Sequence, residues 1–154
     1  MPSPKLNVGR YSRAGEIYAV TVVTGGREPV FRNENYAAHA IVAIRDCELS
    51  RLSDSLAWVV MPEHVHWMFA LRLGTLGACV QRFKSVSTRA INACRSGAES
   101  VWQRGYYDHR LRSDEDLLAQ ARYIVANPIR RGLARRIEDY PYWWARHIHS
   151  SADL

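Results

Sequence analysis

The sequence of 154 residues contains very little lysine and cysteine, and it has no long apolar run. A helix that spans a membrane needs about 20 consecutive apolar residues, so no such span is expected. The amino terminus also lacks the apolar segment that a secretory signal requires. Lys5 and Lys84 are the only lysines, and arginine therefore supplies nearly all of the positive charge. We expect a cytoplasmic protein without a membrane partner.

The three cysteines are too few and too far apart to define a structural framework. Cys47, Cys79 and Cys94 are an odd number and form no C-x-x-C pair. Disulfide-rich domains and zinc ribbons need paired, closely spaced cysteines, so both classes are excluded. Each cysteine is predicted to fill a small apolar site on a helix, in a reducing compartment.

The composition is that of a soluble globular protein with a basic balance. Hydrophobic residues make up 47% of the chain and charged residues 23%, which excludes a disordered class. A net charge of +6 permits a nucleic-acid partner without proving one. The length predicts one domain over residues 1–154, with a flexible basic arm at 1–15 and a basic, aromatic tail at 134–154.

Hydrophobic periodicity predicts four strands and three helices. Their order favours a ferredoxin-like α+β sandwich, with helices on one face of an antiparallel sheet and the last helix over the other face. A tight turn at Pro62 and Glu63 would join the second and third strands into a central hairpin. The predicted strands are 17–24, 55–60, 64–69 and 101–111. The first predicted helix runs from Asn33 or Asn35 to about Ser53, and the second runs from Gly74 to about Cys94. The third has its N-cap at Ser113 and runs from Leu117 to about Asn127.

Two histidines separated by one residue, His64 and His66, are the first candidates for chemistry. Side chains alternate between the faces of a strand, so both imidazoles point to one face while Val65, Trp67 and Phe69 point into a core. The ring nitrogens can then converge on one divalent ion. Taken alone, the pattern fits equally well two ordinary histidines on a half-exposed polar face.

Tyr123 and Asn127 lie four residues apart on the last predicted helix and therefore on one helix face. If this helix covers the open face of the sheet, Asn127 offers a carbonyl oxygen as a third ligand and Tyr123 reaches the substrate side of the ion. Two imidazoles and one amide oxygen leave positions for phosphate oxygens, which suits Mg²⁺ or Mn²⁺. A tyrosine that only anchors the helix to the core is the alternative interpretation.

Three segments of the chain together resemble a known family. The sequence MPEHVH at 61–66 resembles the HUH motif of single-tyrosine transposases. The sequences WQRGYYDH at 102–109 and YIVANPIRRGL at 123–133 are similar to the REP-associated branch of that family. The resemblance extends from about Ile17 to Leu133, which is most of the chain. The joint occurrence of the motifs in this order is more specific than either motif alone.

The resemblance implies a reaction on DNA. His64, His66 and Asn127 would bind the Mg²⁺ or Mn²⁺ ion. Tyr123 would attack a phosphodiester of single-stranded DNA, which leaves a 5′-phosphotyrosine and a free 3′-OH. The implied partner is single-stranded DNA with a palindromic hairpin, and the implied location is the nucleoid. Basic residues predicted to hold DNA phosphates are Arg82, Lys84, Arg89, Arg104, Arg130 and Arg131.

The chain departs from the family at two places. Glu63 stands where the family often has Asn, and it is either an extra carboxylate near the ion or a turn residue. Trp143 and Trp144 stand where the branch often has Trp-Ser-Ser. Asp108 and His109 match the family pattern but receive no catalytic role. A hairpin-binding protein without cleavage and a metal-dependent hydrolase of small substrates remain alternative functions, and the sequence does not choose between a monomer and a homodimer.

Overall fold

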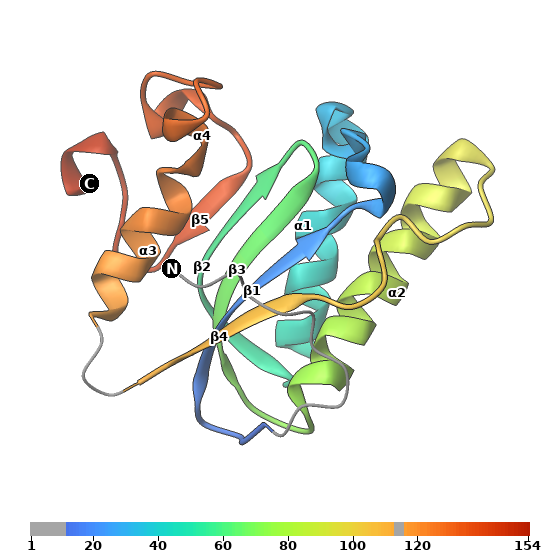
Figure 1. The fold of residues 1–154 in the computed structure, drawn as a ribbon, viewed down its shortest axis with the longest axis horizontal. Helices are drawn as coiled ribbons and strands as arrows, with labels where there is room; N and C mark the ends of the chain where they lie inside the picture. Colours follow the sequence, from blue (N-terminus) through green and yellow to red (C-terminus); the bar gives the residue numbers. More distant parts are fainter. Residues whose placement is uncertain (1–11, 113–115) are drawn as a thin grey trace.

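The computed structural model describes residues 12–112 and 116–154, so the predicted arm up to residue 11 and the predicted N-cap at Ser113 lie outside the described residues. A five-stranded antiparallel sheet in the order β4-β1-β3-β2-β5 forms the centre of the molecule (Figure 1). The strands are β1 (Ile17–Val23), β2 (Ser53–Met61), β3 (His64–Leu71), β4 (Tyr107–Leu111) and β5 (Trp143–Ala145), and the α-helices are α1 (Glu34–Leu49), α2 (Leu76–Arg95), α3 (Leu117–Val125) and α4 (Asn127–Arg130).

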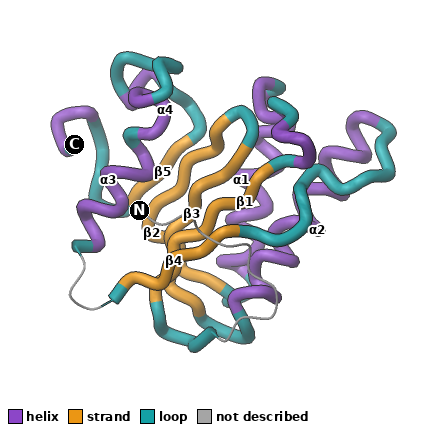
Figure 2. The backbone as a smooth tube through the Cα atoms, in the orientation of Figure 1, coloured by secondary structure: helices purple, strands orange, loops and turns teal. Residues whose placement is uncertain are grey.

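The predicted fold class is confirmed by this order of elements. Two long helices, α1 and α2, cover one face of the sheet, and α3 packs on the other face (Figure 2). The hairpin of β2 and β3 is central, because β3 pairs with β1 on its other side. The turn at 62–63 joins Met61 directly to its partner His64, as predicted.

The alternation of side chains in β3 divides the protein into two cores. Val65, Trp67 and Phe69 are fully buried between the sheet and the two long helices. Trp67 packs against Phe83 of α2, with ring centroids 5.6 Å apart, and its indole N–H donates to the Ser55 hydroxyl at 2.9 Å. Each of these large aromatic side chains removes much apolar surface from water and so stabilises this core.

The second core lies under α3 and the carboxy-terminal segment. It is smaller and joins α3 mainly to β2 and β5. The part of this face over β1 and β4 stays open, because residues of both strands line a cleft there. The buried members of this core are Ala57, Val59, Met61, Met68, Leu111, Ala121, Ile124, Val125, Ile137, Ala145 and Ile148.

The helix starts were predicted well and the ends less well. Asn33 caps α1 by accepting hydrogen bonds from two backbone N–H groups, and Thr75 caps α2. Helix α1 ends at Leu49 rather than near Ser53, and Leu49 is 86% exposed, so it does not belong to the buried stripe. Helix α3 begins at Leu117 as predicted, but the prediction of Ser113 as its N-cap is wrong, because Asp116 caps the helix.

Two further expectations are corrected by the structure. The fourth strand does not begin at Val101: β4 starts at Tyr107, and in the preceding segment Gly105, with a φ of 77°, turns the chain. The region 134–154 is not a mere tail, because it contributes β5 to the edge of the sheet and two short 3₁₀ helices, η3 (Ile137–Asp139) and η4 (Ser151–Asp153).

The cysteines follow the prediction in two cases out of three. Cys47 and Cys79 are buried between α1 and α2, whereas Cys94 is exposed, with its Sγ 3.3 Å from His39 Nε2. The prediction of a small apolar site is therefore wrong for Cys94. In the part of the chain that the structure describes, no helix combines the length and the apolar character that crossing a membrane demands.

Candidate active site

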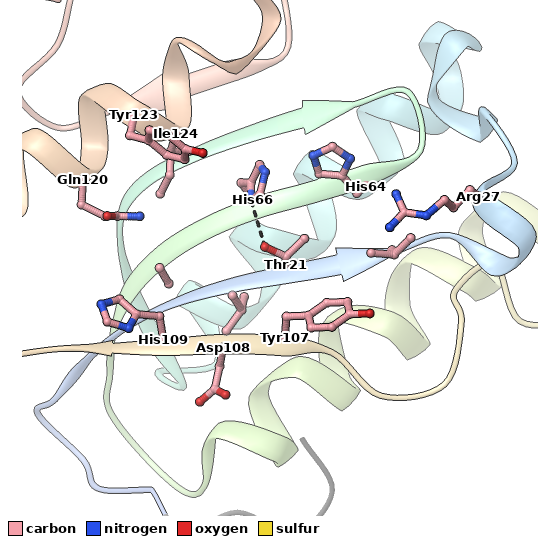
Figure 3. Close-up of a pocket in the computed structure, with 13 residues that line it drawn as sticks. Thr21, Arg27, His64, His66, Tyr107, Asp108, His109, Gln120, Tyr123 and Ile124 are labelled. Atoms are coloured by element: carbon pink, nitrogen blue, oxygen red, sulfur yellow. Dashed lines mark hydrogen bonds between the residues drawn. The ribbon is translucent and has the colours of Figure 1, made fainter. Parts of the chain in front are cut away.

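An open cleft of about 1000 Å³ lies on the sheet face that α1 and α2 leave free (Figure 3). Strands β1, β3 and β4 form its floor, and α3 forms one wall. Both predicted histidines and Tyr123 line this cleft, so the structure brings together residues 57 or more positions apart. The lining residues are Ala19, Val20, Thr21, Val23, Arg27, His64, His66, Tyr107, Asp108, His109, Gln120, Tyr123 and Ile124.

The hairpin register puts the two imidazoles side by side. His64 pairs with Val23 and His66 pairs with Thr21 across the β1–β3 ladder, so all four side chains lie on the cleft face. The two rings are 4.5 Å apart between centroids, at an interplanar angle of 80°. The predicted convergence of the histidines on one face is confirmed by this register.

Hydrogen bonds fix one nitrogen of each imidazole. His64 Nδ1 lies 2.9 Å from Glu63 Oε1, and His66 Nδ1 lies 2.9 Å from the Thr21 hydroxyl. The Nε2 atom of His64 is buried and has no hydrogen-bond partner among the described residues. A buried polar nitrogen without a partner is costly, which indicates a site that a ligand completes.

Burial keeps both imidazoles neutral. Burial lowers the pKa of His64, although the carboxylate of Glu63 acts in the opposite direction. Burial and the neighbouring His64 lower the pKa of His66 to about 3. Neutral imidazoles are the form that binds metal ions, so the pair fits half of a divalent-metal site.

The structure does not place a third metal ligand beside His64 and His66 as clearly as it places the two histidines. Within residues 12–112 and 116–154, no group of three or more His, Cys, Asp or Glu side chains is placed to hold a metal ion. A third protein ligand would therefore be an amide or hydroxyl oxygen. Asn127 is buried at the start of α4 and is not among the residues that line the cleft, so its role as a ligand stays a prediction. Gln120 does line the cleft, one helical turn before Tyr123 (Figure 3).

Tyr123 stands on the cleft side of α3 and is 57% exposed. Its neighbour Ile124 is buried in the second core and holds this part of the helix to the sheet. The guanidinium of Arg130 lies 3.9 Å from the centroid of the Tyr123 ring and also donates to the Tyr123 carbonyl at 2.6 Å. The alternative interpretation, a tyrosine that anchors the helix in the core, is wrong for so exposed a ring.

Arg131 connects α4 to the hairpin turn. Its Nη1 lies 2.7 Å from Glu63 Oε1, the same oxygen that contacts His64. Burial raises the pKa of Glu63, but the hydrogen bond from Arg131 and the charge of the neighbouring groups outweigh burial and lower it. Glu63 is therefore an anion near the histidine pair as well as a turn residue.

The predicted phosphate contacts fall into two groups. Arg130 and Arg131 lie beside the candidate site. Arg82 and Lys84 belong to α2, on the opposite side of the sheet from the cleft, and their donors are used within the protein: Arg82 pairs with Asp46 at 2.7 Å, and Lys84 donates to two backbone carbonyls. Arg89 is exposed on α2, and Arg104 is exposed in the segment before β4. A DNA contact through these four stays a prediction that their placement does not favour.

Sequence reasoning missed Arg27 and Gln120. Arg27 belongs to the 3₁₀ helix η1 (Gly25–Arg27) and points from the end of β1 toward His64 (Figure 3). The signal was present, since antiparallel pairing of the first and third strands places the end of β1 next to His64. The i, i+3 spacing from Tyr123 could have indicated Gln120. His109 also lines the cleft, whereas the Asp108 carboxylate points away from the histidines (Figure 3).

Comparisons with known proteins agree with this site. Residues 14–127 match the family described as IS200-like transposases. The REP-associated tyrosine transposase of Escherichia coli (strain K12) is 27% identical over 135 residues, which cover 86% of this chain and 78% of that protein. A solved structure of a REP-associated tyrosine transposase bound to a REP hairpin superposes with a TM-score of 0.74 at 27% identity, over 89% of this chain and 81% of that one.

A family match over most of the chain settles the class of protein. The chain belongs to the IS200-like transposase family. Its similarity to REP-associated tyrosine transposases, in sequence and in fold, confirms the branch that the motifs at 61–66, 102–109 and 123–133 predicted.

Proposed function

We propose that this transposase cuts and rejoins single-stranded DNA beside a palindromic hairpin, with Tyr123 as the nucleophile. The observation that carries the proposal is the meeting of an exposed tyrosine with two neutral imidazoles in one cleft, although Tyr123 comes from α3 and the histidines from β3. A binding protein has no need of this combination. The similarity to a structure described as bound to a REP hairpin supports a hairpin as the DNA partner.

The reaction that these residues support is a transesterification. The Tyr123 hydroxyl loses its proton and forms a bond to phosphorus, and the bond from phosphorus to the 3′ oxygen breaks. The 3′ oxygen takes up a proton, which leaves a free 3′-OH and a 5′-phosphotyrosine. Attack by a 3′-OH on that phosphotyrosine reverses the step and rejoins DNA without an external energy source.

A divalent ion, Mg²⁺ or Mn²⁺, belongs to the proposal. His64 and His66 would hold it, with Asn127 or Gln120 as candidate oxygen ligands. Such an ion, when bound, neutralises charge on the phosphate oxygens. The chain contributes Arg27, which lines the cleft, and its guanidinium group can hold a neighbouring phosphate of the strand.

A single chain is proposed to form a complete site. Tyr123 and both histidines of the same chain line one cleft, so no second subunit has to supply the nucleophile. This arrangement supports action as a monomer.

The test is covalent capture of DNA. The protein is incubated with single-stranded oligonucleotides that carry palindromes from the source genome, with Mn²⁺ or Mg²⁺, and the products are separated on a denaturing gel. We expect a metal-dependent protein–DNA band that disappears in Tyr123→Phe and His64→Ala. Matched controls are Tyr142→Phe and the exposed His147→Ala, which should retain the band.

Two outcomes would replace the proposal. Tight hairpin binding without an adduct under any metal would establish a hairpin-binding protein that does not cleave. Absence of DNA binding, or a DNA affinity that does not fall as the salt concentration rises, would point to a hydrolase of small substrates.

A further inference from the structure

One carboxylate, that of Glu63, joins two parts of the candidate site. Its Oε1 atom lies 2.9 Å from His64 Nδ1 and 2.7 Å from Arg131 Nη1. The Glu63 side chain is only 12% exposed, and it belongs to the two-residue turn between β2 and β3. Arg131 is the residue that caps the carboxyl end of α4. The ion pair therefore connects the hairpin turn to the segment that follows the tyrosine helix.

The adjacent residue connects the same segment to the nucleophile. Arg130 holds Tyr123 by its contact with the ring face and by a hydrogen bond to the backbone carbonyl. Two consecutive arginines thus reach in two directions: Arg131 reaches the partner of His64, and Arg130 reaches Tyr123. The two contacts link Tyr123 to the carboxylate that contacts His64.

We propose that Glu63 and Arg131 form a positioning pair that orients His64 and anchors the tyrosine helix at the correct place beside it. The inference rests on the proposed function for its catalytic meaning. Glu63 accepts from His64 Nδ1–H, which leaves the lone pair of Nε2 directed into the cleft. Arg131 compensates the negative charge and fixes α4 to the hairpin turn.

The negative charge of Glu63 beside a proposed DNA site calls for a compensating function, and the ion pair with Arg131 supplies one. A negative charge next to a site for DNA phosphates weakens DNA binding unless a cation balances it. An amide, which the resembling family often has here, would accept the same hydrogen bond from His64 without that cost. What the carboxylate adds is the ion pair with Arg131, whose charge-assisted geometry is stronger than a neutral hydrogen bond.

The first test concerns His64 and uses no DNA. Long-range ¹H–¹⁵N NMR of the metal-free protein reports which ring nitrogen carries the proton, and the free Mn²⁺ signal in EPR reports metal affinity. Glu63→Ala should give a mixture of His64 tautomers and weaken Mn²⁺ binding roughly 10- to 100-fold. Glu63→Gln retains an acceptor oxygen, so it should keep the Nδ1–H tautomer and lose less than about tenfold in affinity. An unchanged tautomer and affinity in Glu63→Ala would overturn the orienting role.

The second test concerns the anchor. Arg131→Ala should leave the His64 tautomer unchanged but increase amide hydrogen exchange in residues 117–131, because the tyrosine helix loses its attachment to the turn. The matched control is Arg136→Ala, which removes a more exposed ion pair, that with Glu138 at 2.8 Å, from the same region of the chain. Exchange in 117–131 that rises equally in both variants, or in neither, would overturn the anchoring role.

The third test links the pair to the reaction. In single-turnover adduct formation, Arg131→Ala should lower the maximal rate more than the DNA affinity, whereas loss of a simple phosphate contact would mainly weaken affinity. Adding Glu63→Ala to Arg131→Ala should cost less than the two separate effects multiplied, because both act through one pair. If the wild type forms no adduct, the proposed function fails, while the NMR and exchange results still decide the positioning pair.

Discussion

At the scale of one residue, the protonation of His66 is coupled to folding. Burial, followed by the neighbouring His64, lowers its pKa to about 3, whereas an imidazole in an unfolded chain titrates near 6.5. Between these two values the unfolded chain binds a proton that the folded chain excludes. The contribution of neutral His66 to the free energy of unfolding is therefore complete above pH 6.5, and it decreases as the pH falls toward 3.

Replacing His66 by Gln should remove this sensitivity to acid. For one proton the loss of stability reaches at most about 1.4 kcal/mol per pH unit, so the metal-free wild type should lose stability faster than the variant between pH 6 and 4. Urea unfolding at several pH values measures the difference. His147→Gln, at an exposed histidine, is the control and should follow the wild type. Equal slopes for wild type and His66→Gln would contradict the prediction.

The residues of the site differ in how far the sequence could predict them. His64 and His66 were predictable because a period of two places them on one face of any strand. The exposure of Tyr123 was not, because an amphipathic helix places tyrosine in a core as readily as in a cleft. Predicting that Arg27 lines the cleft requires the register of β1 against β3, and predicting the same of Gln120 requires the position of α3. Both are products of tertiary packing.

At the scale of elements, the segment before β4 shows how one side chain can hold a stretch without regular structure. The ammonium of Lys84, on α2, donates to the carbonyls of Gln103 and Gly105 at 3.0 and 2.6 Å. Burial lowers the pKa of Lys84, in keeping with a half-enclosed position. Trp102 of the same segment packs against Phe83, so α2 fixes this stretch by two different contacts.

Lys84→Met should therefore destabilise the fold without changing how the protein responds to salt when it binds DNA. Two carbonyls lose their donor, and we expect a loss of about 1–3 kcal/mol in the free energy of unfolding, measured by urea denaturation. Arg89→Met, on the exposed face of the same helix, is the control and should change stability by less than about 0.5 kcal/mol. A variant of normal stability whose DNA affinity falls would instead assign Lys84 to the DNA interface.

The elements themselves were predictable where local signals are strong. Capping residues fixed the starts of α1 and α2, and a continuous β-branched and aromatic run fixed β2. Strand β5 has only three residues, Trp143–Ala145, in an aromatic segment without alternation, and it exists because β2 offers a free edge. Local sequence does not encode that partner, so the segment resembled a tail.

At the scale of the whole molecule, the two faces of the sheet have different charge roles. Arg27 lines the cleft and Arg130 contacts the Tyr123 ring, while Arg82 on the helix face is paired with Asp46. The net charge of +6 alone does not say which face meets DNA. The salt dependence of DNA binding by variants on each face can identify that face, because each phosphate contact releases counterions.

The face of the sheet that binds DNA can be identified by measuring hairpin affinity over a range of salt concentrations, with Tyr123→Phe as the parent protein. Adding Arg27→Gln should reduce the slope of log affinity against log salt by about one unit, as expected for the loss of one phosphate contact. Adding Arg82→Gln should leave the slope unchanged. The reverse result, a change with Arg82→Gln alone, would place the DNA on the helix layer.

The alternation in β3 also ties the proposed metal site to correct strand pairing. A shift of the strand by one residue would turn His64 and His66 into the apolar layer and Trp67 toward water. A molecule with that error would lose the proposed ion site and the apolar core at once. If Mn²⁺ binds at the proposed site, the fraction of a refolded preparation that takes it up should therefore equal the fraction whose sheet has assembled in register.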